Sequence, residues 1–299
     1  MTKWQITAAI LFTLVILGGS LSGNLDAMSW PSEDAVLIRN FGFNDMGRPV
    51  LGMVFNGGSG ILAADKGEVI FSRGKNDTGS RLPSPLGAWT AVDHGDGLIS
   101  IYSRYDGAPS DEVDSFPNIE KSQPIALPGS SGWSSRDGFY FIVFDRRDRR
   151  WINPAMIVTP VQETRPVQIL SVELRNAQGL AVQSRALSQG RYTVIVNTQV
   201  RPAANAPYSS PASILAPQRI VCMVNGAEAG SLNFEAFYAR DGVLMVYRNG
   251  LIPARQVYAA FPAFEAAEVT LTRGQANLEI IVQPITGNPS SVINRLVIN

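Results

Sequence analysis

The segment AEVTLTRGQANLEIIVQP, residues 267–284, decides the fold class of the chain. Apolar side chains stand at positions 267, 269 and 271, and again at 276, 278, 280 and 282 after a Thr-Arg-Gly turn. A period of two places alternate side chains on opposite faces of an extended strand. The segment therefore predicts two β-strands, each with one buried face.

The same pattern recurs between residues 167 and 299, where seven β-rich runs fit into about 130 residues. This density of short alternating strands predicts an immunoglobulin-like β-sandwich over residues 167–299. The paired cysteines of antibody domains are missing, because Cys222 is the only cysteine in the chain. Cys222 stands in the apolar run RIVCMVNG, which predicts that its side chain is buried as a small hydrophobe.

Residues 31–160 form a more broken pattern that predicts another β domain. Short apolar runs are interrupted by Gly, Asp, Asn or Ser, and sequences such as GDG are typical of hairpin tips. The segment TPVQETRPV, residues 159–167, predicts a linker. The fold class is therefore expected to be all-β, with domains at residues 31–160 and 167–299.

The N-terminal residues 1–27 have the pattern of a targeting segment. Lys3 provides a positive start, and the apolar run AAILFTLVILGG over residues 8–19 is followed by small residues. The run is shorter than the ~20 residues that a membrane-spanning helix needs. We expect a signal peptide or, alternatively, an uncleaved N-terminal anchor as the only membrane contact, and export to the periplasm or cell envelope.

Composition narrows the classes of function. The 25 Lys and Arg residues balance the 25 Asp and Glu residues, which argues against a nucleic-acid partner. His94 is the only histidine, whereas a zinc hydrolase normally takes two or three imidazoles from its own chain. Residues 167–299 contain neither histidine nor lysine, so a nucleophilic mechanism there would lack a base. No cofactor is expected.

Five segments of the first domain resemble, in their order and spacing, the LytM-type (M23) peptidases. These peptidases are zinc endopeptidases that cut peptidoglycan cross-links. The resemblance covers about residues 40–158 and implies an M23-like β-sheet domain. The segments are FGFNDMGRPVLGMVF, GILAADKGEVIFSRG, GLISIYSRY, NIEKSQPIALPGSSG and GFYFIVFDRRDRRWINP.

The residues that would carry the family's chemistry are replaced. The resemblance places Val50 at the first metal histidine and Val54 at the metal aspartate. Arg104 falls at the catalytic histidine, and Gly138 and Tyr140 fall at the two histidines of the His-x-His-Phe strand. These side chains cannot replace a set of imidazole and carboxylate ligands, and arginine cannot act as a base. The resemblance therefore implies a degenerate, catalytically dead domain without a metal.

The former catalytic groove remains a candidate binding place. The resemblance puts Arg104 on its floor, with Tyr102, Tyr140, Trp89 and Trp133 as further candidate lining residues. Arginine can pair with a carboxylate, and aromatic faces suit sugars and peptides. The alternatives are that the aromatic residues belong to the core or rim, and that Arg104 is a structural plug.

Two further features have simpler interpretations. His94, in VDHGDG, is expected to be a hairpin-turn residue rather than a ligand. The charged run FDRRDRR, residues 144–150, is expected to be a solvated hairpin tip, with contact to an anionic partner as the alternative.

The hypothesis for function is a non-enzymatic cell-envelope protein. Its M23-like domain would bind peptidoglycan, or would regulate a cell-wall hydrolase in the manner of the family's degenerate amidase activators. The alternative is a structural or docking component of a periplasmic assembly. An active M23 metallopeptidase is disfavoured because the ligands are absent.

Overall fold

The computed structural model describes residues 27–74, 84–106, 117–134, 137–158, 167–182, 186–201 and 213–299. The predicted targeting segment, except Ala27, and residues 159–166 of the predicted linker lie outside this range. Within the described residues, no helix has both the length and the apolar character needed to cross a membrane. Strands dominate, which confirms the all-β class.

The first part of the chain is built around one antiparallel sheet. Its central strands follow the order β9-β6-β7-β8-β11, with β4 also paired to β11 and β1 to β4. One face of this sheet buries the apolar core that contains Phe55, Tyr102 and Phe141. The strands are β1 (Val36–Arg39), β2 (Asn44–Asp45), β3 (Arg48–Pro49), β4 (Met53–Asn56), β5 (Ile61–Leu62), β6 (Gly67–Arg73), β7 (Ala88–Asp93), β8 (Leu98–Tyr105), β9 (Asn118–Ile119), β10 (Pro124–Ala126), β11 (Gly138–Asp145) and β12 (Arg150–Ile152).

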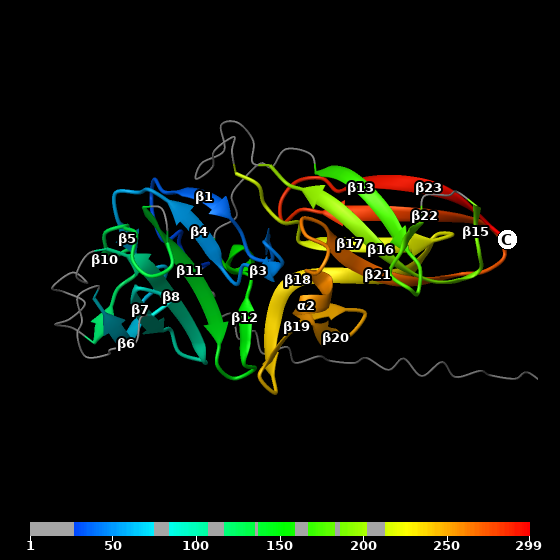
Figure 1. Cartoon of the computed structure of the whole chain (residues 1–299). Coiled ribbons are helices and arrows are strands. Elements are labelled where there is room, and N and C mark those ends of the chain that lie inside the picture. The colour runs from blue at the N-terminus through cyan, green and yellow to red at the C-terminus, as the bar shows by residue number, and fades with distance from the viewer. Residues whose placement is uncertain are drawn as a thin grey trace, which may run out of the picture.

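The second part of the chain places two layers of strands against each other (Figure 1). One layer has the order β14-β13-β16-β21, and the other contains β15-β23-β22-β17-β18, with β19 beside β18 and β20 beside β19. The immunoglobulin-like topology of this part stays a prediction. The elements are β13 (Gln168–Arg175), β14 (Ala181–Val182), β15 (Ala186–Leu187), β16 (Gly190–Gln199), β17 (Arg219–Val224), β18 (Ala227–Arg240), β19 (Val243–Arg248), β20 (Leu251–Pro253), α2 (Ala254–Val257), β21 (Phe264–Leu271), β22 (Gly274–Gln283) and β23 (Ser290–Ile298).

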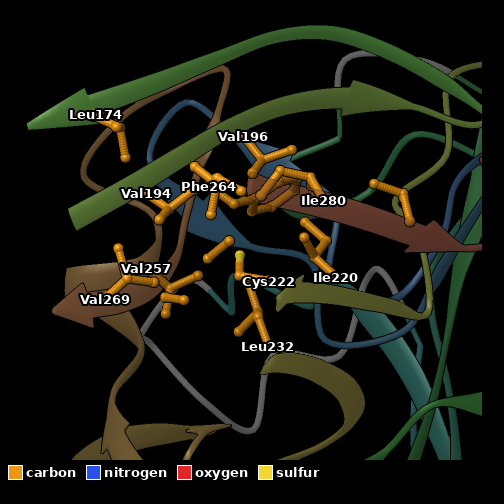
Figure 2. Packing of buried hydrophobic residues seen from close by; sticks show 14 of the residues in the cluster. Leu174, Val194, Val196, Ile220, Cys222, Leu232, Val257, Phe264, Val269 and Ile280 are labelled. Carbon is orange, nitrogen blue, oxygen red and sulfur yellow. The ribbon is translucent and has the colours of Figure 1, made fainter. Parts of the chain in front are cut away.

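Apolar side chains from both layers meet between them, as Figure 2 shows for Val194, Phe264 and Ile280. Cys222 lies in this core and is fully buried, which confirms the expectation from its apolar run. Burial, with the nearby Glu228 carboxylate, raises the pKa of the Cys222 thiol to about 12. The thiol therefore stays protonated and acts as a small apolar side chain.

The two parts share a continuous sheet. Strand β12 pairs with β11 on one side and with β18 on the other, so one 15-stranded sheet runs through both parts (Figure 1). Phe41, from the first part, is fully buried in the second core, 5.1 Å from the Phe237 ring. Tyr258 donates a buried hydrogen bond of 2.6 Å from its hydroxyl to the carbonyl of Gly42. These contacts fix the orientation of the candidate site relative to the second part.

Candidate functional site

Arg104 stands at a bulge in β8. The register with β7 pairs Ala88 with Tyr105 and Trp89 with Ser103, which leaves Arg104 as the extra residue. Arg104 has a φ of 68°, and its backbone N–H donates to the carbonyl of Leu86 at 2.8 Å. A left-handed backbone is costly for any residue with a Cβ, so the surrounding strands hold this conformation. The bulge re-aims the Arg104 side chain.

The side chain of Arg104 lies over Tyr140 on the neighbouring strand β11. The guanidinium carbon is 4.7 Å from the centre of the Tyr140 ring, which is a cation–π contact. The Tyr140 hydroxyl accepts a hydrogen bond of 2.7 Å from the backbone N–H of Leu51. Burial raises the pKa of Tyr140 well above its usual value, although the Leu51 N–H and the Arg104 charge lower it in part. Tyr140 is therefore a neutral phenol, with its hydroxyl bonded to the Leu51 N–H and its ring in contact with the Arg104 guanidinium.

The place where the resemblance puts the metal ligands is filled with apolar side chains. Val50 and Tyr140 are each only 8% exposed, and Val54 lies opposite Tyr140 in the pairing of β4 with β11. The structure thus brings Val50, Val54, Arg104 and Tyr140 together. Gly138 begins β11 beside Asn56, where a side chain would collide with the carbonyl of Phe55. The other side chains of the cluster are Phe43, Leu86, Ile101, Ile142 and Trp151.

Arg104 has no acidic partner in this cluster. Among the described residues, no carboxylate lies within ion-pair distance of its guanidinium, and Asp93 instead pairs with Arg146 at 3.5 Å. The Nε atom of Arg104 is buried and has no hydrogen-bond partner there. Its side chain is otherwise only partly buried. A cation in this position favours an anionic ligand, because an unpaired charge near apolar surface is poorly solvated.

Tyr102 is not part of the cluster, which corrects the candidate lining set. It is fully buried on the opposite face of the sheet, 5.3 Å from the Phe141 ring. Its hydroxyl accepts hydrogen bonds from the N–H of Ala64 at 2.7 Å and from Ser100 Oγ at 3.1 Å. Strict alternation along a strand would put the side chains of Tyr102 and Arg104 on the same face of the sheet. The bulge at Arg104 instead turns the Arg104 side chain to the opposite face.

Trp89 shares the sheet face of Tyr140, because Ser103 pairs with both of them. The Trp89 ring stacks on Phe71 of β6, with centroids 4.1 Å apart and planes 21° apart. Phe71 is 42% exposed, so this aromatic pair is accessible from solvent. Sequence reasoning missed Phe71, because the pairing of β6 with β7 cannot be deduced from either run alone.

Trp133 lies on a separate turn and is 73% exposed. Its backbone N–H donates to the carbonyl of Pro85 at 3.3 Å, next to Leu86 of the apolar cluster. Trp133 therefore lies at the rim of the apolar cluster. An exposed tryptophan on a turn suits contact with a partner surface.

The residues at this place do not fit a zinc ion. Valine and glycine offer no lone pair in their side chains, and the Tyr140 phenol is neutral and already accepts a hydrogen bond. In the described part of the chain, no group of three or more His, Cys, Asp or Glu residues could hold a metal.

His94 is tied into the β7–β8 hairpin by both ring nitrogens. Nδ1 lies 2.7 Å from the carbonyl of Lys66, and a carbonyl only accepts, so Nδ1 carries a proton. Nε2 lies 2.7 Å from Ser100 Oγ. His94 is therefore a structural hairpin residue, as its sequence context indicates.

The charged run at residues 144–150 contains the turn between β11 and β12, and its aspartates balance its arginines. Asp145 accepts hydrogen bonds from the backbone N–H groups of Arg147 and Asp148 and from the guanidinium of Arg150. Burial opposes ionisation of Asp145, but these hydrogen bonds together lower its pKa. The aspartate holds the turn in place and balances the arginines around it.

Solved structures similar to this chain include M23 peptidases. The catalytic domain of a prophage-encoded M23 protein from Enterococcus faecalis is 18% identical, with 42% of this chain and 94% of that chain covered and a TM-score of 0.34. A zinc-containing peptidase from Vibrio cholerae is 20% identical, with coverage of 43% and 39% and a TM-score of 0.35. Lysostaphin from Staphylococcus simulans is 14% identical, with coverage of 74% and 85% and a TM-score of 0.33.

These similarities assign neither a family nor an activity to the chain, because the identities and TM-scores are low. A protein-family model that carries no description of function matches residues 166–299. No curated protein matches the sequence.

Proposed function

We propose that this chain is a non-catalytic cell-envelope protein whose first β domain, residues 31–160, binds peptidoglycan. The observation that carries the proposal is the contact of Arg104 with Tyr140 above Val50 and Val54. Apolar packing occupies the positions that hold the metal ligands in the peptidases that the sequence resembles. At its surface stands Arg104, a cation that has no carboxylate partner among the described residues.

The available chemistry suits wall material. Peptidoglycan offers carboxylates on its peptides and sugar rings on its glycan chains. Arg104 can form charge-assisted hydrogen bonds to a carboxylate, and the accessible Phe71–Trp89 pair can pack against a sugar ring. Both features belong to the sheet face of Tyr140, so one ligand can contact them together.

Export to the periplasm or cell envelope belongs to the same proposal. It rests on the apolar run at residues 8–19 and the small residues after it. The domain boundary at residues 159–166 is likewise proposed from its proline-rich sequence.

Co-sedimentation with isolated sacculi tests the proposal. The wild-type protein should sediment with the sacculi, and Arg104→Ala should lose affinity by roughly 2–5 kcal/mol, because one charge-assisted contact in a partly desolvated place is removed. Arg240→Ala is the matched control, since Arg240 is an exposed arginine in the second part of the chain. Equal loss with both variants would indicate non-specific charge attraction.

The finer alternative is regulation of a cell-wall hydrolase through the same residues. In that case the wild-type protein would not sediment with bare sacculi, but it would raise the rate at which a purified amidase releases wall fragments. Arg104→Ala would remove that activation. Failure of both experiments would leave docking within a periplasmic assembly as the remaining hypothesis.

A further inference from the structure

Among the residues that the structure describes, strand β23 forms an edge of the long sheet over most of its length. Strand β22 pairs with it over its whole length, from Ser290 to Ile298. On the other side, the short strand β15 pairs only with Val297 and Ile298. Figure 1 shows β23 next to β22, with β15 near the C-terminal end. Within the described residues, the outer side of residues 290–296 has no strand partner.

The backbone groups that face this open side can be identified. The N–H of Asn299 donates to the carbonyl of Leu187 at 2.7 Å, and its carbonyl accepts from the N–H of Gln189 at 3.2 Å. Asn299 therefore directs both groups away from β22. Because these directions alternate along a strand, Ser291, Ile293 and Arg295 also direct their N–H and C=O groups outwards.

The side chains along this edge are unusual for a strand that stays alone. Ile293 is 57% exposed, and a surface cavity of about 460 Å³ lies against residues 293–296. The Nδ2 atom of Asn294 is buried without a hydrogen-bond partner among the described residues. Edge strands are usually protected by charges, prolines or bulges, whereas Arg295 is the only charged residue of β23.

We propose that β23 pairs with β23 of a second copy of this chain. A row of backbone donors and acceptors recognises another extended backbone, and the sequence of this strand is complementary to itself. An antiparallel pair centred on Ile293 places Ile293 against its own copy and Ser291 against Arg295. No two like charges face each other, and the apolar residue meets an apolar residue.

This register uses Ser291, Ile293 and Arg295, and it leaves Val297 and Ile298 to their pairing with β15. Each of the pairs centred on Ile293 can exchange two backbone hydrogen bonds. The two Asn294 side chains lie diagonal to each other on the core-facing side. The resulting dimer has one two-fold axis and an isologous interface. The proposal does not depend on peptidoglycan binding.

Sedimentation velocity over a range of protein concentrations tests the dimer. The wild-type protein should shift from the mass of one chain to twice that mass as its concentration rises. Ile293→Pro removes an outward N–H that β22 does not use, so this variant should remain folded and stay monomeric. Ile293→Thr keeps the N–H and the strand preference, so it should still dimerise.

A second measurement needs no variant. The amide hydrogens of Ser291, Ile293 and Arg295 should exchange more slowly with solvent at high protein concentration than at low concentration. Wild-type protein that stays monomeric at every concentration, or dimerisation that Ile293→Pro leaves intact, would overturn the proposal. Pairing of β23 with a different protein would appear as the first of these outcomes.

Discussion

Asn40 and Ala216 exchange two buried hydrogen bonds across the junction between the two parts of the chain. Asn40 Nδ2 donates to the carbonyl of Ala216 at 3.0 Å, and the N–H of Ala216 donates to Asn40 Oδ1 at 2.6 Å. The two residues are 176 positions apart in sequence. A side-chain amide that imitates a strand partner in this way joins the parts specifically, because both backbone groups would otherwise be buried without a partner.

Asn40→Ala should therefore destabilise the protein by roughly 2–5 kcal/mol, since it leaves a buried donor and a buried acceptor unsatisfied. Urea denaturation measures the change. Asn176→Ala is the control, because Asn176 caps an exposed turn through the N–H groups of Gln178 and Leu180 and should cost about 1 kcal/mol or less. An equal loss of unfolding free energy in the two variants would show that the junction contributes no more to stability than an exposed turn.

The shared sheet predicts that both parts unfold together. Strand β12 pairs with β18, and Phe41 belongs to the second core, so neither part can lose its structure without exposing the other. Calorimetry should show a single transition whose calorimetric and van't Hoff enthalpies agree. Two separate transitions would contradict this coupling.

Arg104→Gly should separate the role of Arg104 in binding from its role in folding. Glycine relieves the left-handed backbone at a gain of about 1–2 kcal/mol, whereas loss of the cation–π contact costs about 0.5–1 kcal/mol. Thermal unfolding should therefore change little or move slightly upwards, while sedimentation with sacculi should be lost. A large drop in the melting temperature would instead identify Arg104 as a structural plug.

The raised pKa of the Cys222 thiol predicts that the folded protein loses stability in alkali. Burial is the main reason that the folded-state pKa of this thiol is raised from 9.0 to about 12. The contribution of the thiol to the free energy of unfolding is therefore fully present below pH 9.0 and is lost as the pH rises towards about 12. In this pH range the free energy of unfolding of the wild type should fall more steeply with pH than that of Cys222→Ala, by about 1.4 kcal/mol per pH unit. The difference is the one proton that the Cys222 thiol loses on unfolding. The free energy of unfolding, measured with urea between these pH values, checks this. Parallel curves for the two proteins would show that the thiol does not titrate differently on unfolding.

The sequence predicts the all-β class well, because alternation with a period of two is a local signal. The burial of Cys222 follows from its apolar run. The assignment of Val50, Val54, Arg104 and Tyr140 to one groove comes from the resemblance to the M23 peptidases and stays a prediction. The face of Tyr102 could not be predicted, because one extra residue at Arg104 changes the alternation and nothing in the letters SRY marks a bulge.

The junction and the Phe71–Trp89 pair escaped sequence reasoning for another reason. Both depend on which strands become neighbours, and β12 and β18 are far apart in the chain. Trp151 in RWI indicates a strand residue, but it does not indicate that Phe237 lies opposite. Non-local pairing is decided by the packing of the whole molecule.

Incubation of the purified protein with isolated sacculi in the presence of zinc tests whether the chain binds the wall without cutting it. Pellet and supernatant report binding and cleavage in the same sample. We expect the wild-type protein to enter the pellet, Arg104→Ala to stay in solution, and no wall fragments to appear in the supernatant. Release of wall fragments by the wild-type protein, or binding that is unaffected by Arg104→Ala, would contradict it.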